Sequence, residues 1–353
     1  MNQGVDAAAT TPKRAHLGRD LTIIGVVLAV LLGAAAAGVV VLYQQLYSPK
    51  AFVERYLSLL SDGRAADALT MPGVPIDSAE LQAAGLPLAA SDALLRQAAL
   101  GSLTDIETTK TVADGETTVV HVAYKAGGHA GTTMFTVERN GWIGVAPAWR
   151  FARSPLSVID VHVRGSMQFS VNDFRLDKRQ VSPDMLDAEP FEPVPMLVFS
   201  PGLYHVAVDT AIAATPGVNV LADQPLVTVP VDLQAEPTQE FVDVVQQRVD
   251  EFLAACATQE VLQPTACPFG YFVADRIDGP PKWSIAADPV ITVVPDDAHW
   301  AIPATEAVAH IAVDIVSLFD GSVQHTSEDV PFTVSGTITV LPDDSVAIHV
   351  GGG

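Results

Sequence analysis

The sequence predicts an α+β protein. One N-terminal transmembrane helix is followed by two units of helices packed on an antiparallel sheet, separated by a small β-sandwich. Three observations indicate this class. A long uncharged apolar run lies near the N-terminus, and in two separate stretches helical spacing of apolar residues gives way to alternation. Between those stretches the pattern is of strands and turns alone. The 353 residues are enough for two or three domains.

The apolar run covers residues 21–43, which are 23 residues without a charge. A helix of that length spans roughly 35 Å, and the hydrocarbon core of a bilayer is about 30 Å thick. A cleavable signal peptide with a cleavage site at residues 34–37 is the alternative. The apolar run continues past those alanines, so we expect an uncleaved anchor in the lipid bilayer.

Basic residues predict the orientation of this anchor. Lys13, Arg14 and Arg19 precede the run, whereas Lys50 is the one base just after it. The positive-inside rule then makes residues 1–20 a cytoplasmic tail and places residues 44–353 outside. We therefore expect a single-pass protein of the cell membrane with extracytoplasmic C-terminal domains.

Small residues recur every four positions within the run. On a helix they form one narrow stripe, which allows two backbones to approach closely and predicts a homodimer face. The other interpretation is that alanine and glycine are simply common in this segment. The stripe consists of Gly25, Ala29, Gly33 and Ala37.

Residues 44–154 are expected to form the first α+β unit. Ser48 is a good N-cap and Pro49 suits the first helical position, with apolar residues at helical spacing after them. Shorter helical stretches are expected at residues 65–69 and 92–100. The period then changes to that of a strand meander, with Asn140-Gly141 as one of its turns. The predicted strands are residues 106–112, 117–125, 132–139 and 143–151.

The other two units follow from similar patterns. Residues 155–235 contain strands and turns alone, which predicts a β-sandwich spacer. Residues 236–353 repeat the plan of the first unit, because Thr238 can cap a helix and strands come after it. The strands expected there are residues 290–294, 308–318, 332–341 and 346–350.

Charged residues are distributed unevenly along the chain, and their balance indicates which classes of partner the protein can bind. The chain carries a formal net charge of −22, and residues 180–353 contain 25 acids and 3 bases. Nucleic acid is excluded as a partner because its phosphates require a basic face. Such a surface favours a cationic protein face or a cation-bridged cell-wall component.

The order of elements resembles a known superfamily. A helix followed by a curved meander, outside a single anchor, is similar to the nuclear transport factor 2-like (cystatin-like) units of actinobacterial envelope proteins. The resemblance rests on two segments, Ser48-Pro49-Lys50-Ala51-Phe52-Val53 and Val334-Ser335-Gly336-Thr337-Ile338-Thr339-Val340. A third segment resembles the short β-domains between such units, and it is Pro201-Gly202-Leu203-Tyr204. The layout is similar to that of the teicoplanin-resistance-associated membrane proteins of Gram-positive bacteria. The cytoplasmic zinc ribbon of that family is absent, since no cysteine precedes residue 256.

Two cysteines lie on the outer side, where disulfides persist. Cys256 ends the predicted helix of the third unit and Cys267 lies in the loop after it. We expect them to form a disulfide, and two unpaired buried thiols are the alternative.

Motifs for catalysis, nucleotides or metals do not occur in the chain. There is no Gly-x-Ser-x-Gly elbow, P-loop or His-Glu-x-x-His, and the nine histidines have no ligand spacing. No catalytic residue, metal site or cofactor is therefore expected, and Tyr124 and His121 become candidates only by analogy with enzymes of the resembled superfamily.

The predicted function is that of a non-enzymatic binding or scaffold protein of the bacterial cell envelope. The alternative is a small-molecule sensor with a ligand in a cone cavity, and an enzyme on the same fold is the third. Four tryptophans are candidates for a ligand or partner surface, with core packing as the competing interpretation. They are Trp142, Trp149, Trp283 and Trp300.

Overall fold

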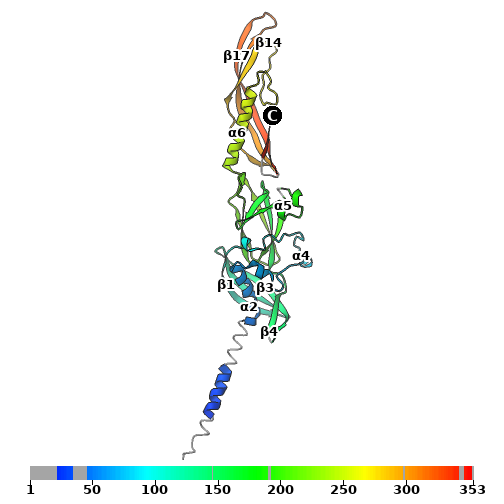
Figure 1. The fold of residues 1–353 in the computed structure, drawn as a ribbon, viewed down its shortest axis with the longest axis vertical. Helices are drawn as coiled ribbons and strands as arrows, with labels where there is room; N and C mark the ends of the chain where they lie inside the picture. The colour runs from blue at the N-terminus through cyan, green and yellow to red at the C-terminus, as the bar shows by residue number, and fades with distance from the viewer. Residues whose placement is uncertain are drawn as a thin grey trace, which may run out of the picture.

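The computed structural model describes residues 22–34, 46–144, 146–189, 192–296, 299–341 and 346–351. It shows a protein of helices and mostly antiparallel strands, arranged as an elongated molecule with the N-terminal helix at one end (Figure 1). The predicted mixture of helices and antiparallel sheets is confirmed at this level.

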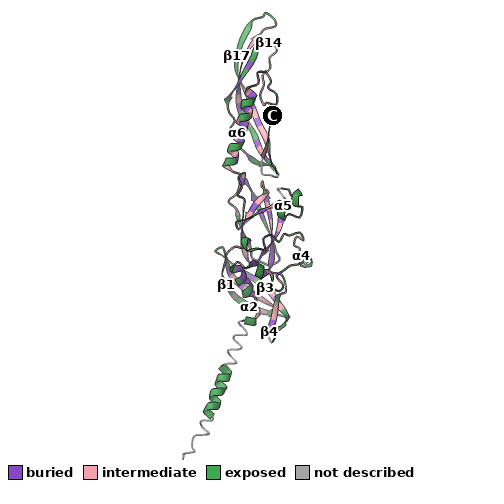
Figure 2. Cartoon of the chain, in the orientation of Figure 1, coloured by how far each residue is buried: buried purple, intermediate pink, exposed green. Residues whose placement is uncertain are grey.

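Residues 22–34 form a helix with exposed side chains (Figure 2). This helix carries Gly25, Ala29 and Gly33 of the expected dimer face. Apart from chain neighbours and the helix's own backbone, no described atom lies within 4 Å of a Cβ placed on either glycine. The tail 1–20, residue 21 and residues 35–43, with Ala37 among them, lie outside the described residues. Among the residues that are described, no helix combines the length and the apolar character needed to cross a membrane.

The first unit begins with α2 (Pro49–Ser61). Ser48 caps it as expected, because its Oγ accepts a hydrogen bond from the backbone N–H of Ala51. The buried face of α2 packs on a four-stranded antiparallel sheet in the order β1-β2-β3-β4. The remaining elements of the unit are α3 (Ala65–Leu69), α4 (Ser78–Ala84), η1 (Gln97–Ala99), β1 (Leu103–Asp114), β2 (Thr117–Ala126), β3 (His129–Ile143) and β4 (Ala146–Phe151).

Two local predictions for this unit are wrong. The helix expected at residues 92–100 is reduced to the single turn η1, because Ser91 pairs with Met196 and Arg96 has extended backbone angles. Asn140-Gly141 is not the turn between the last two strands. Both residues lie inside β3, where the pairing with β4 shifts register between Arg139 and Trp142. Gly141 has a φ of 79°, so its freedom serves a bulge.

The middle unit consists of two sheets with a shared core. One sheet has the order β11-β9-β6-β7 and the other β12-β5-β8, in which β12 and β5 are parallel. Residues of both sheets belong to one buried cluster. The elements are β5 (Leu156–Arg164), β6 (Gln168–Val171), β7 (Phe174–Asp177), α5 (Lys178–Val181), η2 (Met185–Asp187), β8 (Val194–Phe199), β9 (Gly202–Ala207), β11 (Val218–Ala222) and β12 (Thr228–Gln234), and the short strands β10 (Ala213–Ala214) and β13 (Glu236–Pro237) pair with each other.

The third unit places α6 (Gln239–Ala257) on one sheet in the order β14-β16-β17-β18, with β15 paired to β16. Thr238 caps α6 as expected, since its Oγ1 accepts from the N–H of Phe241. The strand expected at residues 290–294 is wrong except for its last residue, and β14 was not expected. The strands are β14 (Arg276–Ala287), β15 (Val294–Asp296), β16 (His299–Val316), β17 (Val323–Val340) and β18 (Val346–Gly351).

Buried contacts join the three units. The core of the middle unit continues into the third through one cluster that includes Phe169, Phe241 and Trp300. The first unit has its own cluster, and the buried hydroxyl of Tyr56 donates across to the backbone oxygen of Ser200 at 3.1 Å. The units are therefore packed end to end.

Candidate binding surfaces

The four candidate tryptophans do not form one surface. Trp283 and Trp300 are 8% and 2% exposed and belong to the core of the third unit. For these two residues the core-packing interpretation is therefore the correct one. The indole N–H of Trp283 donates to the backbone oxygen of Val261 at 2.8 Å. Trp300 packs edge-on against Phe241, with ring centroids 6.0 Å apart.

The other two tryptophans lie together at the end of the first unit where the chain enters from residue 46. The guanidinium of Arg139 lies over both rings, 5.2 Å from the centre of Trp142 and 6.0 Å from that of Trp149. The indole N–H of Trp149 donates to the backbone oxygen of Tyr47 at 2.9 Å, whereas Trp142 is largely exposed. This end of the unit is therefore tied to the segment that follows the predicted anchor.

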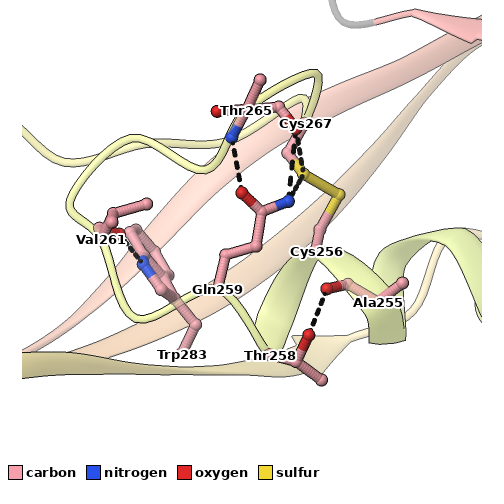
Figure 3. The surroundings of a disulfide bond; sticks show 8 residues. All are labelled: Ala255, Cys256, Thr258, Gln259, Val261, Thr265, Cys267 and Trp283. Carbon is pink, nitrogen blue, oxygen red and sulfur yellow. Dashed lines mark hydrogen bonds between the residues drawn. A yellow bond between two sulfur atoms is a disulfide. The ribbon is translucent and has the colours of Figure 1, made fainter.

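Cys256 and Cys267 are joined by a disulfide, as the sequence predicts (Figure 3). The bond fastens the loop after α6 to the end of that helix. Gln259 sits inside the loop, where its side-chain amide accepts from the N–H of Thr265 and donates to the oxygen of the same residue. Together with the Trp283 hydrogen bond, these contacts fix the path of a segment without regular structure.

Replacing both cysteines with alanine is expected to lower the free energy of unfolding by about 2.5–3 kcal/mol, because the cross-link closes a loop of 11 residues. Urea denaturation monitored by tryptophan fluorescence measures the change. Reduction of the wild-type protein should reproduce the shift and leave the double variant unchanged. Equal stability of oxidised and reduced wild type would contradict a stabilising role for the bond.

The far end of the molecule presents exposed apolar side chains. β16 and β17 form a long hairpin whose loop, residues 317–322, lies opposite the N-terminal helix (Figure 1). Leu318 and Phe319 in this loop are 73% and 99% exposed. Val323, the first residue of β17 after this loop, is also largely exposed. We call Leu318, Phe319 and Val323 the distal tip.

Hydrogen bonds hold the hairpin loop in one shape. Ser317 Oγ accepts from the N–H groups of Phe319 and Asp320, and Asp320 accepts from both the N–H and the hydroxyl of Ser322. Asp275, just before β14, accepts from the N–H of Leu318 at 3.2 Å. The exposed apolar side chains therefore stand on an ordered loop, which lowers the entropy cost of binding through them.

Acidic groups accompany the apolar residues of the distal tip. Asp275, Asp278, Asp314 and Asp320 lie in or next to the hairpin end, where Arg276 is the nearby base. Hydrogen bonds from Ser322 hold the pKa of Asp320 below its ordinary value, so this carboxylate is charged at neutral pH. The distal tip is thus apolar at its centre and negative around it, which is complementary in charge to a basic surface.

A cavity of about 670 Å³ lies where the middle and third units meet. Arg175 and Arg179 contribute cationic groups, while Trp300, Leu186 and Leu341 contribute apolar area. Arg179 is already engaged, since its Nε donates to Asp177 Oδ1 at 2.8 Å. Arg175 is exposed and forms no ion pair with any described acidic residue. The cavity could hold a small anionic molecule with an apolar part.

The two residues considered for catalysis lie apart from these surfaces. Tyr124 is 2% exposed, and burial raises the pKa of its hydroxyl to about 12. It is therefore a poor proton donor near neutral pH. His121 lines a pocket of about 450 Å³ on the sheet of the first unit. Within the described ranges, no three residues of the histidine, cysteine, aspartate and glutamate types gather as a metal site would require.

The sequence alone does not reveal the distal tip, because the alternation over residues 308–318 predicts a strand that ends at Leu318. One signal could have located it. Asp320-Gly321 is a turn dipeptide between two strand patterns, so the apolar residues just before it must lie at a hairpin end.

Comparisons of the chain with protein-family models, with curated proteins and with solved structures found no match.

Proposed function

We propose that the protein is a membrane-anchored, extracytoplasmic binding or scaffold protein of the bacterial cell envelope, without enzymatic activity. The distal tip is the observation that carries this proposal. It places exposed, ordered apolar side chains at the end opposite the N-terminal helix, where a partner above the membrane would be met (Figure 1). The first and third units are proposed as nuclear transport factor 2-like units, because each has helices followed by an antiparallel meander.

The end of the first unit supports a nearby membrane. Tyr47 is four residues beyond the predicted span and is bonded to Trp149, so the unit follows the span with little intervening chain. Trp142 and Arg139 are suited to the headgroup region, where amphipathic side chains place an apolar body and a polar end. The proposed anchor is therefore consistent with the surface that would face the bilayer.

Charge supports a protein partner with a basic face. The acidic residues around Leu318 and Phe319 would repel anionic polymers, while a basic rim around an apolar pocket would accept the tip. Burial of one phenylalanine and one leucine contributes about 3–6 kcal/mol before the costs of association.

The alternative function is that of a small-molecule sensor. The cavity between the middle and third units favours it, because a ligand there would contact both units and change how firmly they pack. A rise in melting temperature with an added anionic amphiphile would support this alternative.

The main proposal is tested by placing a photo-crosslinking phenylalanine analogue at position 319 in cells stripped of their wall. We expect an adduct with one basic protein, and added protease should digest the product from outside. The adduct should decrease several-fold as salt rises from about 50 to about 300 mM, because the Debye length falls from about 14 to about 6 Å. The analogue at Leu88, which is exposed on the first unit, is the control. Equal labelling at both positions, or a protease-protected product, would contradict the proposal.

A further inference from the structure

The two edges of the sheet in the third unit are protected differently. β14 contains Pro280, Pro281 and Lys282, and its pairing with β16 shifts register between Asp278 and Lys282. Proline, lysine and bulges all hinder the addition of another strand. β18 has none of these features. Its six residues, Val-Ala-Ile-His-Val-Gly, pair with β17 without interruption, and the strand ends the sheet.

An apolar groove of about 900 Å³ runs beside the unprotected edge, between β18 and α6. Val346, Ile348 and Val350 alternate along β18 and pack against the core side. Rows of side chains cross the sheet toward them. In one row Trp300 pairs with Ile338, and Ile338 pairs with Ile348. The first two are 2% and 0% exposed, but Ile348 at the edge is half-buried, so the row ends without a covering neighbour.

Two adjoining stripes of α6 have different surroundings. One stripe of α6, including Phe241, Val245 and Val249, is buried on the sheet. The adjoining stripe, with Val244 and Phe252 among its residues, lines the groove together with Phe241, and Val244 is 43% exposed. A strand added to β18 would lie under this second stripe and place its inward side chains against both residues.

We propose that the edge of β18 and the groove beside it accept an extended segment of a partner protein as an additional strand. The segment has apolar residues at alternate positions, which enter the groove, and basic residues at its ends. This inference depends on neither the anchor nor the distal tip, and it assigns a second binding site to the molecule.

Charge selects this occupant over a second copy of the chain. Residues 236–353 contain 18 acids and 3 bases. The exposed side of α6 beside the groove carries Glu240, Asp243 and Glu251, and its one base, Arg248, is paired with Glu251 at 3.0 Å. Two such units would repel each other edge to edge, whereas lysine or arginine at the ends of a strand would be attracted.

The test uses the full-length protein in detergent and the labelled peptide Lys-Lys-Thr-Val-Thr-Val-Thr-Ile-Lys-Lys. Fluorescence anisotropy should show saturable binding that weakens with added salt. A peptide of the same composition without alternation should bind at least tenfold more weakly. So should the alternating peptide carrying an N-methyl group at each of its six central residues, because neither of its edges can then donate backbone hydrogen bonds to β18. Equal binding of the N-methylated peptide would overturn strand addition.

Two matched valine variants locate the site. Val244→Lys places a charge in the groove, whereas Val290→Lys makes the same change at an exposed valine of the same unit outside it. Because both side chains are exposed, both variants should fold, as circular dichroism would verify. We expect Val244→Lys to weaken binding of the alternating peptide at least tenfold and Val290→Lys to leave it within twofold. Equal effects, no binding to the wild type, or a wild-type dimer that Val244→Lys dissociates would each overturn the proposal.

Discussion

Replacement of Trp300 with alanine is expected to lower the free energy of unfolding by about 3–5 kcal/mol, the usual cost of removing a buried aromatic side chain. Trp300 is 2% exposed and packs against Phe241 of α6. It also lies against the middle unit, since a Cβ added to Gly165 would be 3.4 Å from its ring. One truncation therefore leaves a void where two units share their core.

Trp142→Ala is the matched control. Trp142 is 61% exposed on the first unit, so its loss should change stability by less than about 0.5 kcal/mol. Guanidinium denaturation, monitored by far-UV circular dichroism, measures both variants. Because the middle and third units share one cluster, we also expect Trp300→Ala to broaden the transition as the units separate. An effect of Trp300→Ala no larger than that of Trp142→Ala would show that the shared core contributes little to stability.

Much of the fold could be predicted because local chemistry determines it. Ser48 and Thr238 cap α2 and α6 through bonds to N–H groups three residues ahead, and such caps depend on sequence neighbours alone. The strands of the two meanders could be predicted because apolar and polar residues alternate along them, which is also a local pattern. The disulfide could be predicted since its two cysteines are the chain's only ones.

The wrong predictions of secondary structure share a different cause, which is contact with segments distant in the sequence. Residues 92–100 contain good helix formers, yet Ser91 is bound to the strand that holds Met196, and the chain that follows cannot wind into a full helix. β14 was hidden by Gly279, Pro280 and Pro281, which are unfavourable inside a sheet but tolerated at an edge with a bulge. Neither outcome is contained in the local pattern.

The candidate surfaces were less predictable than the fold. Trp283 and Trp300 are buried and Trp142 is exposed, although the same residue type predicts the same role for each. The exposure of Phe319 depends on how far the β16–β17 hairpin extends past α6. The edge of β18 is recognisable only when the strand order is known.

Lys178 is a further residue that the sequence does not identify, because Asp177-Lys178-Arg179 reads as an exposed charged run. Asp177 caps α5 and pairs with Arg179, so the side chain between them turns inward. Lys178 is fully buried, and its Nζ donates to the backbone oxygens of Val163 at 2.6 Å and Glu192 at 3.2 Å. Burial lowers the pKa of this amine from 10.5 to about 8, and the nearby Glu192 carboxylate partly opposes the shift.

The direction of this shift determines how stability depends on pH. Below about pH 8 the amine is charged in both the folded and the unfolded state, and the folded state bears the full cost of burying the charge. Between about pH 8 and 10.5 the folded state releases the proton while the unfolded state retains it. The unfolded state then binds more protons, so this group adds stability as pH rises, by up to about 3 kcal/mol. The neutral amine keeps two N–H donors for the two carbonyl oxygens.

Lys178→Met keeps the length of the side chain and removes the titrating group. We therefore expect the unfolding free energy of the wild type, relative to this variant, to rise by about 2–3 kcal/mol as pH increases from about 7.5 to about 10.5. Urea denaturation at several pH values measures the difference. Lys125→Met is the control, since Lys125 is exposed and its Nζ lies 2.9 Å from Asp105. That contact raises the pKa of Lys125 above 10.5, so its contribution stays nearly constant up to about pH 10.5 and is lost only at higher pH. A difference between wild type and Lys178→Met that stays constant across this range would show that the buried amine does not titrate there.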